Sequence, residues 1–118
     1  MTDLPVLRDI DDDEMRRHLT QTRTYTVVVL RRGPNYGMPN AAAIIWEHGR
    51  RNMQLRDAGI LCVVMPIRDG GELAGVGVFD ASPETTEAII AADPAVAAGV
   101  LSAEVHEASG FPGDHLPA

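Results

Sequence analysis

Apolar and polar residues along this chain follow two periods, one typical of strands and one typical of helices. Short runs of β-branched and aliphatic residues alternate with segments in which apolar residues recur every three or four positions. In order, these patterns fall at residues 24–31, 41–59, 60–67, 73–80, 82–92 and 101–107. The predicted order β-α-β-β-α-β is that of a ferredoxin-like α+β fold, in which two helices cover one face of a four-stranded antiparallel sheet.

Residues at the segment ends support these boundaries. Asn40 and Ser82 are typical helix N-caps, and each immediately precedes a helical pattern. Pro66 marks its strand as an edge strand or as the site of a bulge. Gly75 and Gly77 fall on one face of the next strand, so they leave room for a helix, a ligand or a second subunit to approach the sheet.

Two terminal segments lie outside the pattern. The chain is therefore predicted to have three parts: an acidic arm over residues 1–22, a domain over 23–108 and a coil tail over 109–118. Carboxylates precede arginines within the arm, which suits the helix dipole and predicts a short helix over 12–20. The three adjacent aspartates would not face one way on that helix, so they indicate a solvated cap or an arm that covers a partner rather than a metal site.

Composition narrows the class of function. The chain has 118 residues and a net charge of −7, and all ten of its cationic side chains are arginines. An acidic protein is poorly suited to bind nucleic acid, and the absence of lysine excludes Schiff-base chemistry. The one cysteine, Cys62, lies in an apolar run and is predicted to be an inert core thiol. No apolar run approaches membrane-spanning length and no signal pattern is evident, so no membrane partner and a cytoplasmic location are expected.

His48 is the most informative candidate residue. On a helical wheel with Ile44 at zero, His48 lies at about 40° and Asn52 at about 80°, within the apolar stripe. A buried imidazole needs a polar partner, which is either a backbone carbonyl of the core or a functional group. The spacing of His48, His106 and Asp93 along the chain does not support a metal site. Heme and flavin motifs are absent, so no metal or cofactor is expected.

Two further positions are candidate ligand contacts besides Asn52. Tyr36 lies in the loop over residues 33–40, whose backbone is expected to have few partners nearby in the sequence. This loop either folds down on the core or forms a mobile lid over a pocket. Arg31 ends the first strand and could bind a carboxylate or phosphate, or else be a solvated strand end. His18 and His106 are expected at the surface.

Two segments resemble the YciI-like (YCII-related) family of the dimeric α/β-barrel group, and the resemblance covers roughly residues 25–107. One is His48 followed by Leu55, Ala58-Gly59 and the apolar strand; the other is IAADPAVAAGV at 90–100, which is similar to the family's D-P-x-x-x-x-G signature. The resemblance implies that His48 pairs with Asp93 at the mouth of a pocket. There are two departures: Met65-Pro66 stands where many relatives have Gly-Pro, and an aromatic residue after the last strand is missing.

The resemblance implies a small-molecule pocket protein, since a few relatives are lyases or dehydrochlorinases of small aromatic or lactone-like compounds. An aspartate beside the imidazole would suit cofactor-independent acid–base chemistry, such as isomerisation or elimination. Asp93 also suits a helix cap, and it can fill both roles. The alternative function is a non-catalytic ligand-binding or structural module. A homodimer or higher homo-oligomer is expected because no element remains to cover the second sheet face.

Overall fold

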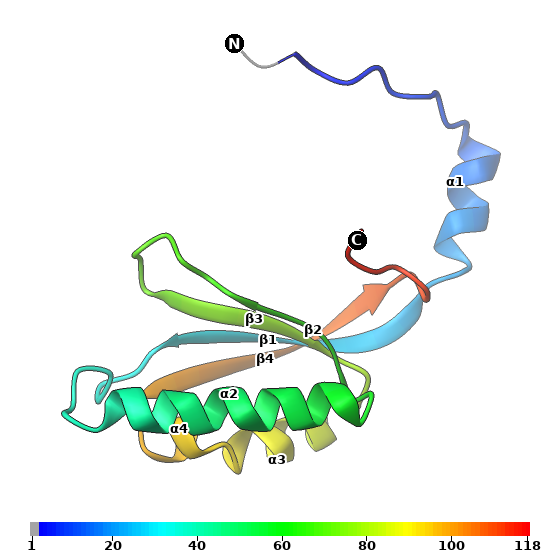
Figure 1. Ribbon diagram of the computed structural model, residues 1–118. Coiled ribbons are helices and arrows are strands. Elements are labelled where there is room, and N and C mark those ends of the chain that lie inside the picture. The colour runs from blue at the N-terminus through cyan, green and yellow to red at the C-terminus, as the bar shows by residue number, and fades with distance from the viewer. Residues whose placement is uncertain (1–2) are drawn as a thin grey trace.

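The computed structural model describes residues 3–118 and has the predicted ferredoxin-like architecture (Figure 1). Its elements are α1 (Asp12–Leu19), β1 (Arg23–Arg32), α2 (Ala41–Asp57), β2 (Leu61–Pro66), β3 (Leu73–Phe79), α3 (Pro83–Ala91), α4 (Pro94–Ala97) and β4 (Leu101–Gly110). The four strands are antiparallel in the order β2-β3-β1-β4, so β2 is an edge strand as Pro66 predicts.

The helix ends follow local capping rules, with one exception. The Ser82 hydroxyl accepts a hydrogen bond from the Thr85 backbone N–H at the start of α3. Gly59 has a φ of 75° just after α2, which is the left-handed conformation that ends helices. Asn40 makes no side-chain cap to α2, contrary to expectation, because its backbone (φ −98°, ψ 11°) does not take the extended N-cap conformation.

Strand β4 is longer than its sequence pattern indicates. It was expected to end at 107, with coil from 109, but it pairs with β1 without interruption from Leu101 opposite Arg32 to Gly110 opposite Arg23. The last three residues, Ala-Ser-Gly, have low strand propensity. Their pairing is set by the ten-residue partner strand, which the sequence pattern alone does not show.

The helix-facing side of the sheet is divided into two halves. In the filled half, α3 and α4 pack against β1 and β4, where Val28, Val100 and Leu101 are buried. In the hollow half, α2 passes over β2 and β3 but packs mainly on α4 and on β2. The two halves therefore share one sheet face and differ in how closely a helix approaches it.

The opposite, open face carries a strip of partly buried valines at positions 27, 29, 76 and 78, and no layer of residues 3–118 covers it (Figure 1). Cys62 is exposed, so the expectation of a core thiol is wrong. The register of β2 shifts between Leu61 and Val63, and Leu61 takes the core position. Cys62 sits in this irregularity of an edge strand and therefore does not reach the core.

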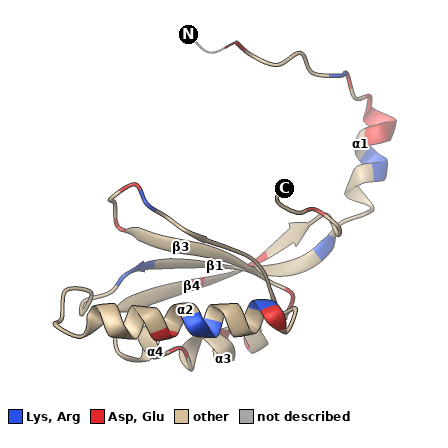
Figure 2. Ribbon diagram, viewed as in Figure 1, with Lys and Arg blue, Asp and Glu red and all other residues tan. Residues whose placement is uncertain are grey.

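The N-terminal arm, described from residue 3, stands away from the body on the open-face side (Figure 1). Its helix α1 has carboxylates in the first turn and basic residues in the last, as expected, and Asp11 caps it by accepting from the Glu14 N–H (Figure 2). His18 and His106 are exposed, as predicted. None of the helices within residues 3–118 is both long and apolar enough to cross a bilayer.

Candidate active site

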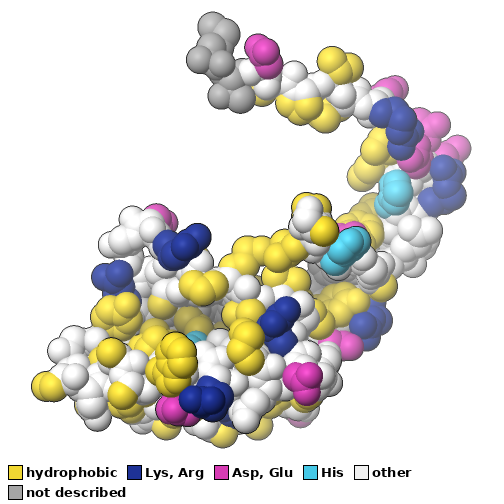
Figure 3. All heavy atoms as spheres, viewed as in Figure 1, with side chains coloured by type: hydrophobic (Ala, Val, Ile, Leu, Met, Phe, Trp, Pro, Cys, Tyr) yellow, Lys and Arg dark blue, Asp and Glu magenta, His cyan; other side chains and the backbone are white. Residues whose placement is uncertain are grey.

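A cavity of about 820 Å³ occupies the hollow half between α2 and the sheet (Figure 3). Its walls are mainly aliphatic, with contributions from α2, β2 and β3, from residues 114–116 of the tail, and from Val28, Leu30, Ile90 and Leu101 at the border with the filled half. Because residues from both faces of β2 line it, the hollow reaches round the edge of that strand. The volume lies within the range typical of small-molecule sites, roughly 300–1,000 Å³.

Two glycines on β3 make this space. A Cβ atom at Gly77 would lie 3.1 Å from the Leu61 Cδ1 atom and 3.4 Å from the Phe79 ring. A Cβ atom at Gly75 would lie 3.2 Å from the Met65 carbonyl oxygen. The open possibilities for these glycines were a helix, a ligand or a second subunit, and the structure places a cavity over them.

His48 and Asp93 meet at one wall of this cavity. His48 projects from the middle of α2, and its Nδ1 atom lies 2.8 Å from the Asp93 Oδ1 atom. Both side chains are largely shielded, with 13% and 3% of their surface exposed. The second carboxylate oxygen accepts hydrogen bonds from the backbone N–H groups of Ala95 (2.9 Å) and Val96 (3.2 Å). Asp93 therefore both caps α4 and holds the imidazole.

Asn52, one helical turn after His48, contacts the other imidazole nitrogen, with its Nδ2 atom 3.2 Å from His48 Nε2. An ionised carboxylate can only accept hydrogen bonds, so the proton between His48 and Asp93 belongs to Nδ1. The Asn52 amide NH₂ group can donate to Nε2 only when that nitrogen carries a lone pair. Accepting a proton at Nε2 requires the Asn52 amide to turn or to withdraw.

The charges around Asp93 favour its ionised form. Burial alone would raise the pKa of Asp93, but the hydrogen bond and charge of His48 and the backbone donors of α4 outweigh it, and the pKa lies below its ordinary value. The Arg51 Nη1 atom is 3.9 Å from Asp93 Oδ1 and is buried, with no hydrogen-bond partner among residues 3–118. The carboxylate thus lies between an imidazole and a guanidinium.

The loop over residues 33–40 borders the cavity at Tyr36 and is hydrogen-bonded at its start. Tyr36 lines the cavity and is 40% exposed, with the Arg32 guanidinium 4.8 Å from its ring centre, whereas Met38 packs against the core. The backbone N–H groups of Gly33 and Asn35 donate to the carbonyls of Val100 and Gly99, each at 2.8 Å. The start of the loop is therefore anchored to the α4–β4 turn by partners that lie far along the sequence.

Arg31 does not reach the cavity. Strand alternation places it on the open face, where its Nε atom donates to Glu104 at 2.9 Å and Glu72 lies 3.7 Å away. The sequence reasoning located Arg31 at a strand end without fixing the face on which it lies. It also missed Met53 and Arg56, which line the cavity from α2. The helical wheel offered a signal for Arg56, which falls at about 120°, next to the stripe of His48 and Asn52.

The sequence matches no protein-family model, and no curated protein matches it. Among solved structures, its fold is similar to that of 5-chloro-2-hydroxyhydroquinone dehydrochlorinase (TftG) from Burkholderia phenoliruptrix AC1100, in complex with 2,5-dihydroxybenzoquinone. The TM-score is 0.51 and the identity 14%, covering 70% of this chain and 90% of that chain. A candidate antibiotic biosynthesis monooxygenase from Chloroflexus aurantiacus J-10-fl gives a TM-score of 0.46 and 21% identity, covering 80% and 100%. The likeness to TftG supports the ferredoxin-like fold, and the YciI-like family remains a resemblance.

Proposed function

We propose that this protein binds a small organic molecule in the cavity beneath α2 and acts on it as a cofactor-independent lyase or isomerase. The observation that carries this proposal is the shielded His48–Asp93 hydrogen bond at the cavity wall. An imidazole held by an ionised carboxylate is suited to take up a proton from a bound molecule and to release it again. His48 is the proposed catalytic residue, and Asp93 positions it.

The proton is taken up at Nε2, the nitrogen not bonded to Asp93. In an elimination, Nε2 removes a proton from a carbon, the C–H electron pair becomes a carbon–carbon double bond, and the leaving group departs from the adjacent carbon with its own electron pair. In an isomerisation, the same proton returns to a different atom of the substrate. In both cases the Asp93 carboxylate stabilises the imidazolium, and the Asn52 amide oxygen accepts from Nε2–H once the amide has turned.

The cavity walls suggest the class of substrate. Aliphatic side chains and two glycines surround the space, and its polar lining residues include His48, Asn52, Asp114 and His115, which favours a partly apolar molecule with polar substituents. Tyr36 and Arg56 also line the cavity and could bind a hydroxyl or anionic group of the molecule. A small hydroxylated aromatic or quinone compound meets these requirements.

The first test uses 2,5-dihydroxybenzoquinone, the compound bound in the TftG neighbour, together with chlorinated hydroxyhydroquinones. We expect binding to the native protein, and turnover that is lost by at least a hundredfold in the His48→Gln variant, with affinity changed only a few-fold. The control is Glu87→Gln, an exposed position of α3 that lies neither at the cavity nor on the open face. Full turnover by His48→Gln would exclude His48 as the catalytic base.

The second candidate function is a non-catalytic ligand-binding module, and one observation favours it. Asn52 already engages Nε2 of His48, so the imidazole has no free nitrogen in this arrangement. The two candidates differ in the response of His48 to pH, followed through its imidazole resonances by NMR. Titration that shifts on addition of the compound supports the enzyme, whereas binding without any titration supports the module.

In either function, we propose that the open face packs on that of a second copy. The valine strip at 27, 29, 76 and 78 would otherwise meet water, and two sheets packed face to face would bury it. Sedimentation at micromolar concentration should then give about twice the 12.7 kDa mass of one chain. A stable monomer would contradict this part of the proposal.

A further inference from the structure

The N-terminal arm is strongly acidic, yet it exposes three large apolar side chains. Leu4, Val6 and Leu7 are 87%, 101% and 81% exposed, and nothing in residues 3–118 covers them. The same arm is strongly acidic, with six carboxylates and one arginine between residues 3 and 14. Contiguous apolar groups on an otherwise charged segment indicate a surface that binds another molecule.

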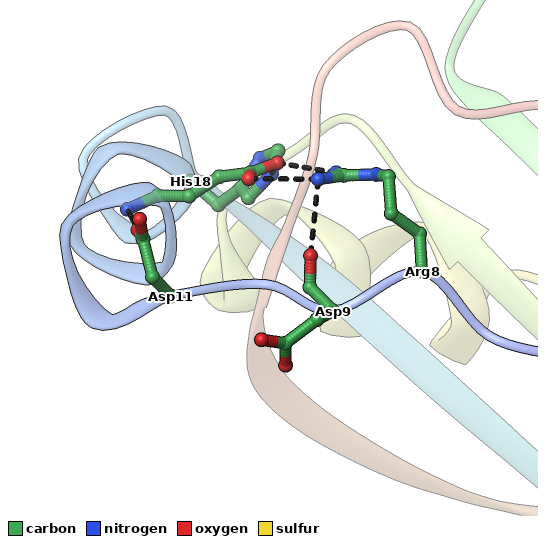
Figure 4. Close-up of polar contacts among 5 residues, drawn as sticks. Arg8, Asp9, Asp11 and His18 are labelled. Carbon is green, nitrogen blue, oxygen red and sulfur yellow. Dashed lines mark hydrogen bonds and ion pairs between the residues drawn. The ribbon is translucent and has the colours of Figure 1, made fainter.

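The arm has a defined bend. The Arg8 guanidinium bonds both to the Glu14 carboxylate and to the Asp9 carbonyl, while His18 approaches the same carboxylate at 3.5 Å (Figure 4). These contacts tie the extended segment to α1. The bend directs the arm over the open-face side of the sheet, where it stands clear of the body (Figure 1). A second copy packed on the open face would lie on the same side.

The outer surface of α2 offers a complementary site. Trp46 and Met53 are 69% and 49% exposed, and Gly49 lies between them on the same side of the helix, so the three form a flat apolar stripe. Arg56 borders the stripe; its Nη1 atom lies 3.6 Å from the Met53 sulfur, and it forms no ion pair within residues 3–118. Figure 2 shows the acidic first turn of α1, and on α2 it shows both basic and acidic segments.

We propose that the N-terminal arm docks on α2 of a second copy, with Leu4, Val6 and Leu7 covering the Trp46–Met53 stripe and the arm's carboxylates beside Arg56. This inference rests on the proposed packing of two open faces. The arm is long enough, since residues 3–11 span about 30 Å when extended and α1 adds about 12 Å. The outer surface of a partner's α2 lies roughly 30 Å away, because stacked layers lie about 10 Å apart and a helix is about 10 Å across.

The docked arm would also border the partner's cavity. Met53 and Arg56 belong both to the proposed docking surface and to the cavity lining. Each copy would then complete the cavity rim of the other, and a substrate would enter between α2 of one copy and the arm of its partner. This placement gives the exposed tryptophan and the exposed arm one common explanation.

Trp46 is the only tryptophan of the chain, so its fluorescence reports docking without any activity assay. In the native protein at micromolar concentration, we expect blue-shifted emission and acrylamide quenching reduced two- to three-fold relative to N-acetyltryptophanamide. The variant with both Val6→Asp and Leu7→Asp should lose this shielding. The matched control is Leu19→Asp, at the far end of α1 and 60% exposed, which should keep it.

A second measurement identifies the occupant. One protein carries the substitutions Val6→Cys, Cys62→Ser and Trp46→Phe, and a nitroxide label is attached to the new cysteine. This labelled protein is mixed with native protein until native mass spectrometry shows mixed dimers. Quenching of the native Trp46 is expected, because the label lies on the other copy. Three results overturn the proposal: no quenching in the mixed dimers, shielding that persists after dilution to monomer, or shielding unaffected by Val6→Asp and Leu7→Asp. None of them bears on His48, which is tested by turnover.

Discussion

The filled and hollow halves of the sheet differ at neighbouring positions of two paired strands. Val28 of β1 lies directly opposite Gly77 of β3, and Leu30 lies opposite Gly75. On β1 the side chains of Val28 and Leu30 pack in the core and also border the cavity, whereas on β3 the two glycines present no side chain to it. The comparison shows that the cavity follows from where β3 carries glycine rather than from a different topology.

The His48–Asp93 hydrogen bond joins the two halves. His48 stands on α2, which forms the wall of the hollow half, and Asp93 caps α4, which belongs to the filled half. The polar group that faces the cavity is therefore fixed by the closely packed part of the molecule. A site is held more accurately when its supporting residues are themselves locked by packing.

The largest expected effect is at this junction. Asp93→Ala removes the cap of α4 and leaves a shielded imidazole without its partner, so we expect a loss of about 3 kcal/mol in the free energy of unfolding. Asp93→Asn keeps an oxygen for the backbone donors and should cost only about 1 kcal/mol. Urea denaturation measures both. Equal costs would mean that the carboxylate charge, rather than the cap, dominates.

The next largest effect on stability is expected when one valine in each half is replaced by alanine. Val100 is fully buried in the filled half, and Val100→Ala should cost about 2–3 kcal/mol through lost burial and a new void. Val64 lines the cavity, so Val64→Ala enlarges an existing space and should cost about 1 kcal/mol or less. If urea denaturation gives similar costs, the hollow half packs more closely in solution than the structure indicates.

A smaller effect concerns acid stability. The pKa of Asp93 is lower in the folded state than its ordinary value, so ionised Asp93 contributes stability that is fully present above about pH 4. That contribution is lost as the pH falls through the lowered pKa, because only the folded state resists protonation. The native protein should therefore lose more stability below pH 4 than Asp93→Asn does. Parallel profiles from urea denaturation at several pH values would contradict this.

The sequence predicts the order of the elements well because hydrophobic period is a local property. The pairing of His48 with Asp93 came from the resemblance, since no local pattern links residues 45 positions apart. The errors concern faces and partners. Cys62 lies at a register shift of an edge strand, and Arg31 lies on the open face of β1.

Two further features that the sequence pattern does not show have the same origin. The backbone partners of the Gly33–Asn35 segment lie at Val100 and Gly99, more than sixty residues further along the chain. The extra residues of β4 likewise depend on the length of β1. Strand faces, bulges and loop anchors are set by long-range pairing, which a periodic pattern does not reveal.

The smallest effect is expected at the two glycines themselves, and they form a matched pair. At Gly77 an added Cβ atom would meet the end of the Leu61 side chain at 3.1 Å, which can move by a few tenths of an ångström. At Gly75 it would meet the Met65 carbonyl oxygen at 3.2 Å, and that backbone is held in the β2–β3 ladder. Both glycines lie within a strand and have no positive φ.

Gly77→Ala should therefore be neutral or stabilise by up to about 1 kcal/mol, because alanine restricts the unfolded chain and the neighbouring side chain can adjust. Gly75→Ala should destabilise by about 1 kcal/mol, since relief of its contact requires a shift of the strand. Both methyl groups would enter the cavity, so both variants should bind 2,5-dihydroxybenzoquinone more weakly than the native protein. Thermal unfolding and a binding titration on the same samples separate the two contributions. Weaker binding by Gly77→Ala with undiminished stability would mean that this glycine serves the cavity, whereas unchanged binding by both variants would place the ligand elsewhere.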